Sequence, residues 1–346
     1  MKSRVILAGD IGGTKALLAL FEEKNGSLTQ VEEASFASED YAGLKEILDD
    51  FLRRTGAAIE KACLGVPGPV VHGKCRTTHH HWWIDAGEVS NQLKIDDVFL
   101  INDMEALAYA VPFLPEDRFE VLQAGDGEKR SRIGLIAPGT GLGQAFLIVF
   151  GGGEFGVLPS EGGHCDFAPR NELEFELFRF LRQTYERVSI ERVLSGYGLS
   201  HIYRFIVQSR SLSEPDWLMR DFREKDAPAV IAQNALLKKS PACEQALDLF
   251  VSIFGAVAGN MALQALAGIC LGGGIAPKII AKLKEETFME AFLAKGRFRD
   301  LLRGIPVKVI IDDKAALLGA ARYAIRGVTG RQGISEIRDS REGGRK

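Results

Sequence analysis

The chain has 346 residues, of which 46% are hydrophobic and 26% charged, the proportions of an ordinary globular protein. At about 150 residues per domain, this length predicts two domains. The 43 basic and 46 acidic residues give a net charge of −3, which excludes the basic surface expected of a protein that wraps nucleic acid. The apolar runs are too short for a membrane helix, and the N-terminal run ends at Asp10, so we expect no signal peptide.

The cysteines and histidines predict no metal site. Five scattered cysteines without a C-x-x-C pair indicate neither a disulfide framework nor a structural zinc site, and they favour a reducing cytoplasm. Three consecutive histidines, starting at His79, cannot all point toward one metal ion on a regular backbone. The basic stretch at 295–303 is short and predicts a solvated face.

In chain order, the first third of the sequence alternates strands and helices. Buried strands are predicted at 4–9 and 16–21, joined as a hairpin by the turn Asp10-Ile11-Gly12-Gly13-Thr14. Apolar residues at helical spacing predict a helix at 41–54. Short strands are then predicted at 62–66 and 97–101, followed by a helix at 104–110.

The same pattern starts again in the middle of the chain. Strands at 133–137 and 144–150 flank the turn Gly139-Thr140-Gly141-Leu142-Gly143. Two strand–turn–strand units predict two related α/β lobes. The remainder is predicted to be mostly helical at 171–205 and 243–267, with strands at 269–271 and 307–311 and a last helix at 314–325. The charged tail from residue 327 predicts disorder.

The first glycine turn is a candidate phosphate site. It is not a Walker A loop, because it lacks that spacing and leads into a strand. Gly12, Gly13 and the amide and hydroxyl of Thr14 can still form a nest for phosphate oxygens, and Asp10 could hold Mg²⁺ through water. The alternative is a plain hairpin turn whose Asp and Gly residues supply left-handed backbone.

Two later glycine clusters favour nucleotide binding. The turns at 10–14 and 139–143 could close on a triphosphate from opposite sides. A third cluster, Gly272-Gly273-Gly274, follows a predicted strand and could let an adenine ring lie against the backbone. Three clusters in this order indicate an ATPase.

Polar residues outside these turns suggest a second substrate. Asp103 could take a proton from a hydroxyl that attacks the γ-phosphate while Asn102 orients the same molecule; alternatively, one of them only caps the next helix. Glu161 and His164 could grip adjacent hydroxyls of a polyol, although His164 could equally be a structural histidine. Glu191 by itself fits an acid in the first turn of a helix.

Together these motifs resemble the bacterial glucokinase family, within the sugar kinase–Hsp70–actin superfamily, over about residues 5–323. The resemblance rests on Gly9-Asp10-Ile11-Gly12-Gly13-Thr14, Ile101-Asn102-Asp103, Pro138-Gly139-Thr140-Gly141-Leu142-Gly143, Glu161-Gly162-Gly163-His164-Cys165-Asp166-Phe167-Ala168-Pro169, Glu191-Arg192-Val193-Leu194-Ser195-Gly196 and Leu271-Gly272-Gly273-Gly274-Ile275. It implies a two-lobed, actin-like ATPase (RNase H-like) α/β fold with an interlobe cleft. The small lobe would comprise 1–112 plus 312–326, the large lobe 113–311, and the tail 327–346.

The resemblance also implies an ATP:hexose 6-phosphotransferase that uses Mg²⁺ to phosphorylate D-glucose in the first step of glycolysis. Asp103 would be the general base for the sugar 6-hydroxyl, and the sugar would contact Asn102, Asp103, Glu161, His164 and Glu191. ATP would contact Asp10, Ile11, Gly12, Gly13, Thr14, Gly139, Thr140, Gly141, Gly272 and Gly273. A homodimer is expected from the family, with no nucleic-acid or membrane partner.

Two departures from the family pattern bear on specificity. Lys15 stands where close relatives often carry Asn, and His79 falls where many members have Asn near the sugar side. A kinase for mannose or N-acetylmannosamine is therefore an alternative, as is a catalytically silent sugar sensor. An actin-like or chaperone-type ATPase is a further alternative, although it would not need Glu161, His164 and Glu191.

Overall fold

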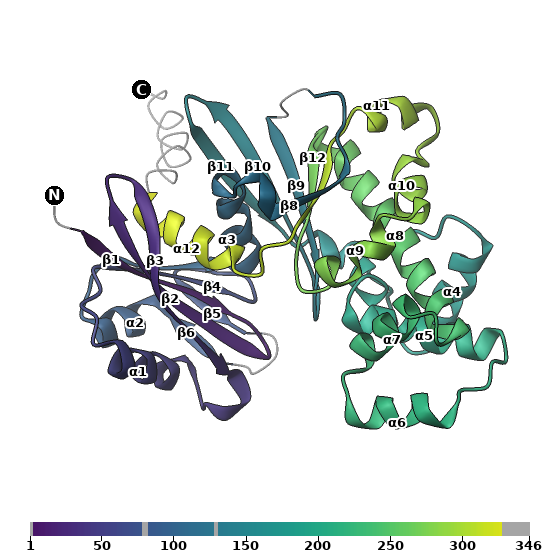
Figure 1. Cartoon of the computed structure of the whole chain (residues 1–346), viewed down its shortest axis with the longest axis horizontal. Coiled ribbons are helices and arrows are strands. Elements are labelled where there is room, and N and C mark those ends of the chain that lie inside the picture. Colours follow the sequence, from purple (N-terminus) through teal and green to yellow (C-terminus); the bar gives the residue numbers. More distant parts are fainter. Residues whose placement is uncertain (1–2, 78–81, 128–130, 327–346) are drawn as a thin grey trace, which may run out of the picture. The chain divides into compact units, whose positions relative to one another are not determined.

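The computed structural model describes residues 3–77, 82–127 and 131–326. The chain divides into two compact units (Figure 1). Unit 1 comprises residues 1–114 and the C-terminal segment that starts at Lys314, and unit 2 comprises Pro115–Asp313. The histidine stretch that starts at His79 and the tail at 327–346 lie outside the described residues.

Unit 1 is built on a five-stranded sheet in the order β3-β2-β1-β4-β7. Its strands are β1 (Arg4–Ile11), β2 (Lys15–Lys24), β3 (Ser27–Ala37), β4 (Lys61–Val66) and β7 (Val98–Asn102). β1 pairs antiparallel with β2 and parallel with β4, and β4 pairs parallel with β7. The nearly continuous apolar runs of β1 and β4 suit strands that are covered on both faces. A separate small hairpin joins β5 (Lys74–Arg76) to β6 (Trp83–Asp85).

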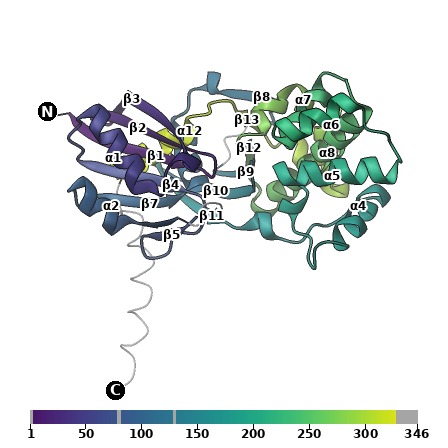
Figure 2. The ribbon, with the colours of Figure 1, turned by 90° about the horizontal axis from the view of Figure 1, so that it is seen from below.

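Helices cover both faces of this sheet (Figures 1 and 2). α1 (Leu44–Thr55) and α2 (Ala86–Leu93) contribute to the core on one face, and α3 (Asp103–Ala110) and α12 (Ala315–Arg326) to the core on the other. α3 and α12 approach so closely that a Cβ on Gly319 would lie 1.7 Å from the carbonyl oxygen of Ala106. The two helices can therefore pack this closely only because Gly319 has no side chain.

Unit 2 repeats the strand arrangement of unit 1, as the repeated sequence pattern predicts. Its sheet has the order β11-β10-β9-β12-β13-β8. β9 pairs antiparallel with β10 and parallel with β12, in the way that β1 pairs with β2 and β4. The strands are β8 (Phe119–Gln123), β9 (Arg132–Pro138), β10 (Leu142–Gly151), β11 (Glu154–Ser160), β12 (Gly268–Leu271) and β13 (Val307–Ile310).

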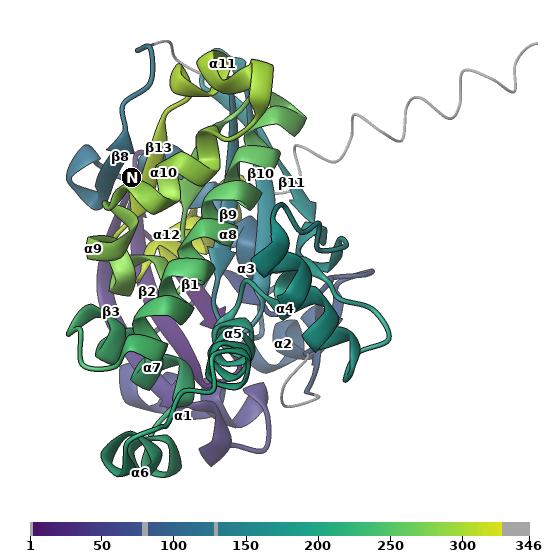
Figure 3. The same ribbon diagram turned by 90° about the vertical axis from the view of Figure 1, so that its right-hand side faces the viewer.

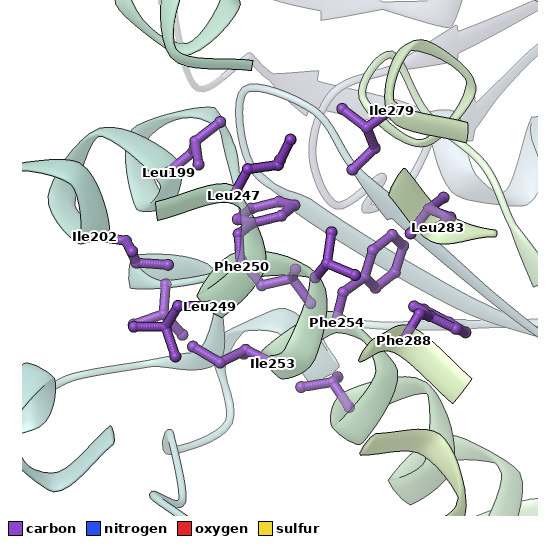
Figure 4. Packing of buried hydrophobic residues seen from close by; sticks show 14 of the residues in the cluster. Leu199, Ile202, Leu247, Leu249, Phe250, Ile253, Phe254, Ile279, Leu283 and Phe288 are labelled. Atoms are coloured by element: carbon purple, nitrogen blue, oxygen red, sulfur yellow. The ribbon is translucent and has the colours of Figure 1, made fainter. Parts of the chain in front are cut away.

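One long helix, α8 (Pro241–Ala265), lies at the centre of unit 2 (Figure 3). It contacts β9 and β12 of the sheet and the helices α5, α7 and α10. Phe254 of α8 is fully buried and meets Phe288 of α10 edge to face, with 5.5 Å between ring centroids (Figure 4). The other helices of this unit are α4 (Glu172–Arg182), α5 (Gly196–Ser209), α6 (Asp216–Glu224), α7 (Ala227–Leu236), α9 (Ile280–Leu283), α10 (Glu286–Leu293) and α11 (Arg299–Arg303).

α8 corrects the expectation that no apolar stretch has the length of a membrane span. By length and composition it could cross a membrane, but 78% of its apolar window is buried inside the structure. Its buried residues, from Ala242 to Ala262, include small side chains and the rings of Phe250 and Phe254, so it packs against protein on nearly every side. It is therefore the core helix of unit 2.

The predicted strands and most predicted helices are confirmed with small shifts at their ends, whereas the helical prediction for 171–205 is wrong in its middle. α4 ends at Arg182 and α5 begins at Gly196, with Ser195 accepting a hydrogen bond from Gly198 N as the helix cap. Val193 and Leu194 in the intervening loop are fully buried. Buried loop residues of this kind imitate the apolar spacing of a helix. The pattern also missed the strands β3, β5, β6, β8 and β11 and the helices α2, α6, α7, α9, α10 and α11.

The basic stretch at 295–303 is not solvated throughout. Arg297, Arg299 and Arg303 are exposed, but Lys295 is half-buried. Its ammonium donates to the carbonyl oxygen of Ala256 at 2.9 Å and to Asn260 Oδ1 at 2.5 Å, both on α8. Burial lowers the pKa of Lys295 to about 8, and the nearby guanidinium of Arg170 acts in the same direction. The expectation of a solvated face is wrong at this residue.

The lowered pKa of Lys295 predicts a pH dependence of stability. Between pH about 8 and its ordinary pKa of 10.5, the unfolded chain retains a proton that the folded chain has lost. The free energy of unfolding therefore rises with pH across this window, because the cost of burying the charge is present below it and lost above it. We expect the free energy of unfolding of wild type, relative to that of Lys295→Met, to be greater at about pH 10 than at about pH 7. Urea unfolding of both proteins at the two pH values measures this difference. A difference that does not change with pH would contradict the assignment.

The close approach of α3 and α12 predicts a large effect for one methyl group. Gly319→Ala should lower the free energy of unfolding by about 3 kcal/mol, because the added carbon meets backbone that cannot rotate away. Gly43→Ala is the matched control in the same unit, since its φ is −177° and a Cβ there meets nothing within 4 Å. Equal losses in the two variants, measured by urea unfolding, would refute the packing argument.

Candidate active site

The first glycine turn joins β1 to β2 and is held by one backbone hydrogen bond of its own and one from the side chain of Ser38. Gly12 N donates to Lys15 O at 2.9 Å, and Ser38 Oγ donates to Gly12 O at 3.1 Å. Gly12 does not adopt a left-handed conformation, but a Cβ there would lie 2.9 Å from Lys15 O. Glycine is thus required at this position by close backbone approach, which corrects the left-handed explanation for this residue.

Two acidic residues lie at the same edge of the first sheet. Asp10 pairs with Gly65 on β4, and Gly65 pairs with Ile101 on β7, just before Asp103. With about 4.8 Å between neighbouring strands, β1 and β7 are about 10 Å apart. Gly65 between them carries no side chain, and a Cβ there would meet Ala106 Cβ at 3.1 Å. Glycine at position 65 therefore lets the start of α3 approach the sheet closely, with Asp103 Cα 3.7 Å from where that Cβ would lie.

Burial raises the pKa of Asp10, and the positive charge of the exposed Lys15 acts in the opposite direction. Lys15 therefore acts electrostatically on the residue proposed for the metal. In the part of the chain that the structure describes, no three His, Cys, Asp or Glu side chains gather as a metal site. A cation held here would depend on one carboxylate, water and ligand oxygens.

Asn102 and Asp103 stand at the start of α3. Asn102 is the helix cap, because its Oδ1 accepts from Met104 N at 2.9 Å, and Asp103 Oδ1 accepts from the same amide at 2.8 Å. The capping alternative is therefore confirmed for Asn102. Both side chains are only half-buried, so capping leaves room for a role toward a ligand.

The second and third glycine clusters lie together in unit 2. Gly272 N donates to Ile136 O at 3.0 Å, and Ile275 N to Pro138 O at 3.3 Å. Gly273 has a φ of 77°, and a Cβ there would lie 2.8 Å from Pro138 O. The end of β12 thus packs directly against the end of β9, where the turn at 139–143 begins. Gly273 is required by this packing whatever it binds.

The three polar residues predicted for a sugar also gather in unit 2. Glu161 precedes the short 3₁₀ helix η4 (Gly162–His164), and Glu191 lies in η5 (Ile190–Arg192). His164 Nε2 is 3.9 Å from Glu161 Oε2, and His164 Nδ1 is 4.0 Å from Glu191 Oε1. The side chains of Glu161 and His164 are 67% and 58% exposed, whereas that of Glu191 is 29% exposed. Two of the three are therefore open to a ligand, and the third is partly enclosed.

Arg187, which sequence reasoning missed, holds the segment around His164. Its Nε donates to Asp166 Oδ1 at 2.5 Å, and its Nη2 donates to the carbonyl oxygen of His164. The same two segments are joined where Phe167 N donates to Val188 O at 3.0 Å and Ile190 N to Cys165 O at 2.9 Å. No local signal marks an arginine in an irregular loop, so only the structure could find it.

Glu191 is more than an acid in the first turn of η5. Its Oε2 accepts from Leu142 N, in the second glycine turn, at 2.9 Å. Ser195 Oγ donates to Glu191 O at 2.8 Å, and Gly196 N donates to Gly139 O at 2.8 Å. The loop that carries Glu191 is therefore bonded at two points to the glycine turn at 139–143.

Comparisons with known proteins agree on one family. The family model Glucokinase matches residues 7–326. The glucokinase of Nostoc punctiforme (strain ATCC 29133 / PCC 73102) is 40% identical over 339 residues, covering 93% of this chain and 99% of that protein.

Solved structures show the same fold. The crystal structure of glucokinase from an Antarctic psychrotroph has a TM-score of 0.78 at 31% identity and covers 93% of this chain and 99% of that one. A ROK family glucokinase from Streptomyces griseus, in complex with glucose and AMPPNP, has a TM-score of 0.61 at 19% identity, with 93% and 100% covered. The two α/β units are thus those of the actin-like ATPase fold of sugar kinases. The chain belongs to the glucokinase family, whose members use ATP to phosphorylate glucose, and this is its activity.

Proposed function

We propose that Asp103 is the general base of this glucose kinase and that Asn102, Glu161, His164 and Glu191 bind sugar hydroxyls. The observation that carries the sugar assignment is the position of His164 between two carboxylates, 3.9 Å from Glu161 Oε2 and 4.0 Å from Glu191 Oε1, with Glu191 contributed by a separate loop. A carboxylate on each side of an imidazole offers hydroxyl groups several acceptors and a donor. Nothing in helix or strand formation requires this arrangement.

Asp103 is suited to accept the proton of the 6-hydroxyl. Its carboxylate is oriented by the Met104 amide at 2.8 Å, and it stands in the first turn of α3, where the helix dipole favours the ionised form. As the sugar O–H bond breaks, the proton passes to Asp103 and the oxygen bonds to the γ-phosphorus. The bond to the β-phosphate breaks and ADP leaves. This transfer requires mainly positioning and charge neutralisation.

Backbone bonds limit which groups of the glycine turns can bind phosphate. Of the proposed nucleotide contacts, the amides of Gly12, Gly139 and Gly272 already donate within the protein. We assign phosphate contacts chiefly to Thr14 and Thr140, which are exposed and carry a hydroxyl beside the amide. The remaining proposed nucleotide contacts, Ile11, Gly13, Gly141 and Gly273, lie in or beside the glycine clusters.

Asp10 fits the way in which Mg²⁺ is usually held beside nucleotides. Mg²⁺ keeps several waters and takes one or two carboxylates besides the phosphates, which suits a lone carboxylate at a strand end. When bound, the cation would neutralise charge on the phosphates. We propose that Asp10 holds it through water, and that Lys15 adds a second positive charge nearby.

We also propose that the protein works as a homodimer in the cytoplasm, in the first step of glycolysis. These assignments follow from the family, and in the described residues all five cysteines are unpaired, as a reducing compartment favours.

Removal of the base should affect turnover rather than binding. Asp103→Ala should lower kcat by about 100- to 10,000-fold, the usual contribution of general-base catalysis, while the KM for glucose changes little. Asp103→Asn, which keeps the hydrogen bond to Met104 N but cannot take a proton, should lose as much. A kcat near that of wild type in the Asn variant would exclude Asp103 as the base.

Sugar specificity is the finer part of the proposal. With ATP and Mg²⁺, we expect kcat/KM for glucose to exceed that for mannose, fructose, glucosamine and N-acetylmannosamine by at least about 10-fold, since polar groups left unpaired by a wrong isomer cost affinity. ADP release measured for each sugar tests this. Comparable turnover of another hexose would leave the mechanism intact and contradict a strict preference for glucose.

A further inference from the structure

The carboxylate of Glu191 has two different neighbours in unit 2. One oxygen, Oε2, accepts the amide hydrogen of Leu142 in the glycine turn at 139–143. The other, Oε1, lies 4.0 Å from His164 Nδ1, beyond hydrogen-bond distance. One side chain thus faces both the group proposed for the sugar and the turn proposed for the nucleotide.

We propose that Glu191 is a positioning residue that links hexose binding to the conformation of the nucleotide turn, besides its contact with the sugar. The inference rests on the site assignment proposed above. A hydroxyl that donates to Oε1 holds the carboxylate in place, so that Oε2 stays bonded to Leu142 N. Coupling of this kind is reciprocal, because whatever the sugar adds to nucleotide affinity the nucleotide adds to sugar affinity.

The carboxylate of Glu191 also lies directly against the glycine turn. A Cβ on Gly141 would lie 2.6 Å from Glu191 Oε2, whereas a Cβ on Gly139, in the same turn, meets nothing within 4 Å. The loop is also bonded to the turn where Gly196 N donates to Gly139 O. Displacement of the carboxylate therefore changes the turn, and displacement of the turn changes the carboxylate.

Glu161 is the matched control for Glu191. Both are proposed to bind the sugar, but only Glu191 bonds to the glycine turn. Titration calorimetry with AMPPNP and Mg²⁺, without glucose, should show affinity roughly 10-fold weaker for Glu191→Ala and changed less than about twofold for Glu161→Ala. Glu191→Gln, whose amide oxygen can still accept from Leu142 N, should restore most of the loss. Equal nucleotide affinities in the two alanine variants would overturn the link.

The glycine turn provides the converse test, which does not depend on Glu191→Ala folding. In Gly141→Ala the new methyl group must push Oε2 aside, so glucose affinity measured without nucleotide should fall by about three- to tenfold. Gly139→Ala should leave that glucose affinity within about twofold, because its methyl group enters open space. If both variants bind glucose equally well, the link is wrong.

A different set of results would show that the proposed sugar contacts themselves are wrong. If Glu161→Ala and His164→Ala both bind glucose as wild type does, the sugar contacts proposed above are wrong. In that case, weakened AMPPNP binding in Glu191→Ala would still support the bond to the turn, but a glucose affinity unaffected by Gly141→Ala would overturn its link to the sugar.

Discussion

Both units depend on one backbone constraint: a strand that pairs antiparallel with its successor through a glycine turn and parallel with a later strand. β1 does so with β2 and β4, and β9 with β10 and β12. Because parallel strands end at the same edge, turn residues and strand ends come together there. Asp10 is placed beside Gly65, and Gly65 beside Ile101, in this way. The cluster around Gly273 is likewise placed against Pro138. The pairing of the strands therefore fixes where these residues lie.

Glycines are required in these turns mainly because other atoms lie where a side chain would be. At Gly12 and Gly141 the backbone is not left-handed, but a side-chain carbon would collide with Lys15 O in one case and Glu191 Oε2 in the other. Gly273 combines a positive φ with such a contact. A glycine-rich turn in this fold is therefore a place where segments touch, and ligand binding is added to a packing requirement. Substitutions there should perturb fold and site together.

Charges are buried in unit 2 where they secure the segments beside the sugar residues. Glu174 is completely buried and paired with Arg170, which also donates to Ser252 on α8. This pair anchors the segment that follows His164 to the core helix. Arg187 ties the same segment to the loop of Glu191. A buried ion pair adds little net stability, and the Arg187–Asp166 pair is exposed. Their value here is that they hold the segment around His164 in a defined place.

The sequence by itself determined the glycine turns, the strands beside them and the polar residues at their ends. Apolar runs and turn chemistry are local signals, and they identified Asp10, Asn102, Asp103 and the turn at 139–143. The loop at 183–195 falls within the range predicted to be mostly helical, because Ile190, Val193 and Leu194 follow helical spacing although they belong to a loop. Only the tertiary structure decided that Glu191 bonds to Leu142, 49 residues away, and that Arg187 supports His164. Such contacts depend on the path of the whole chain around α8, and no local pattern encodes that path.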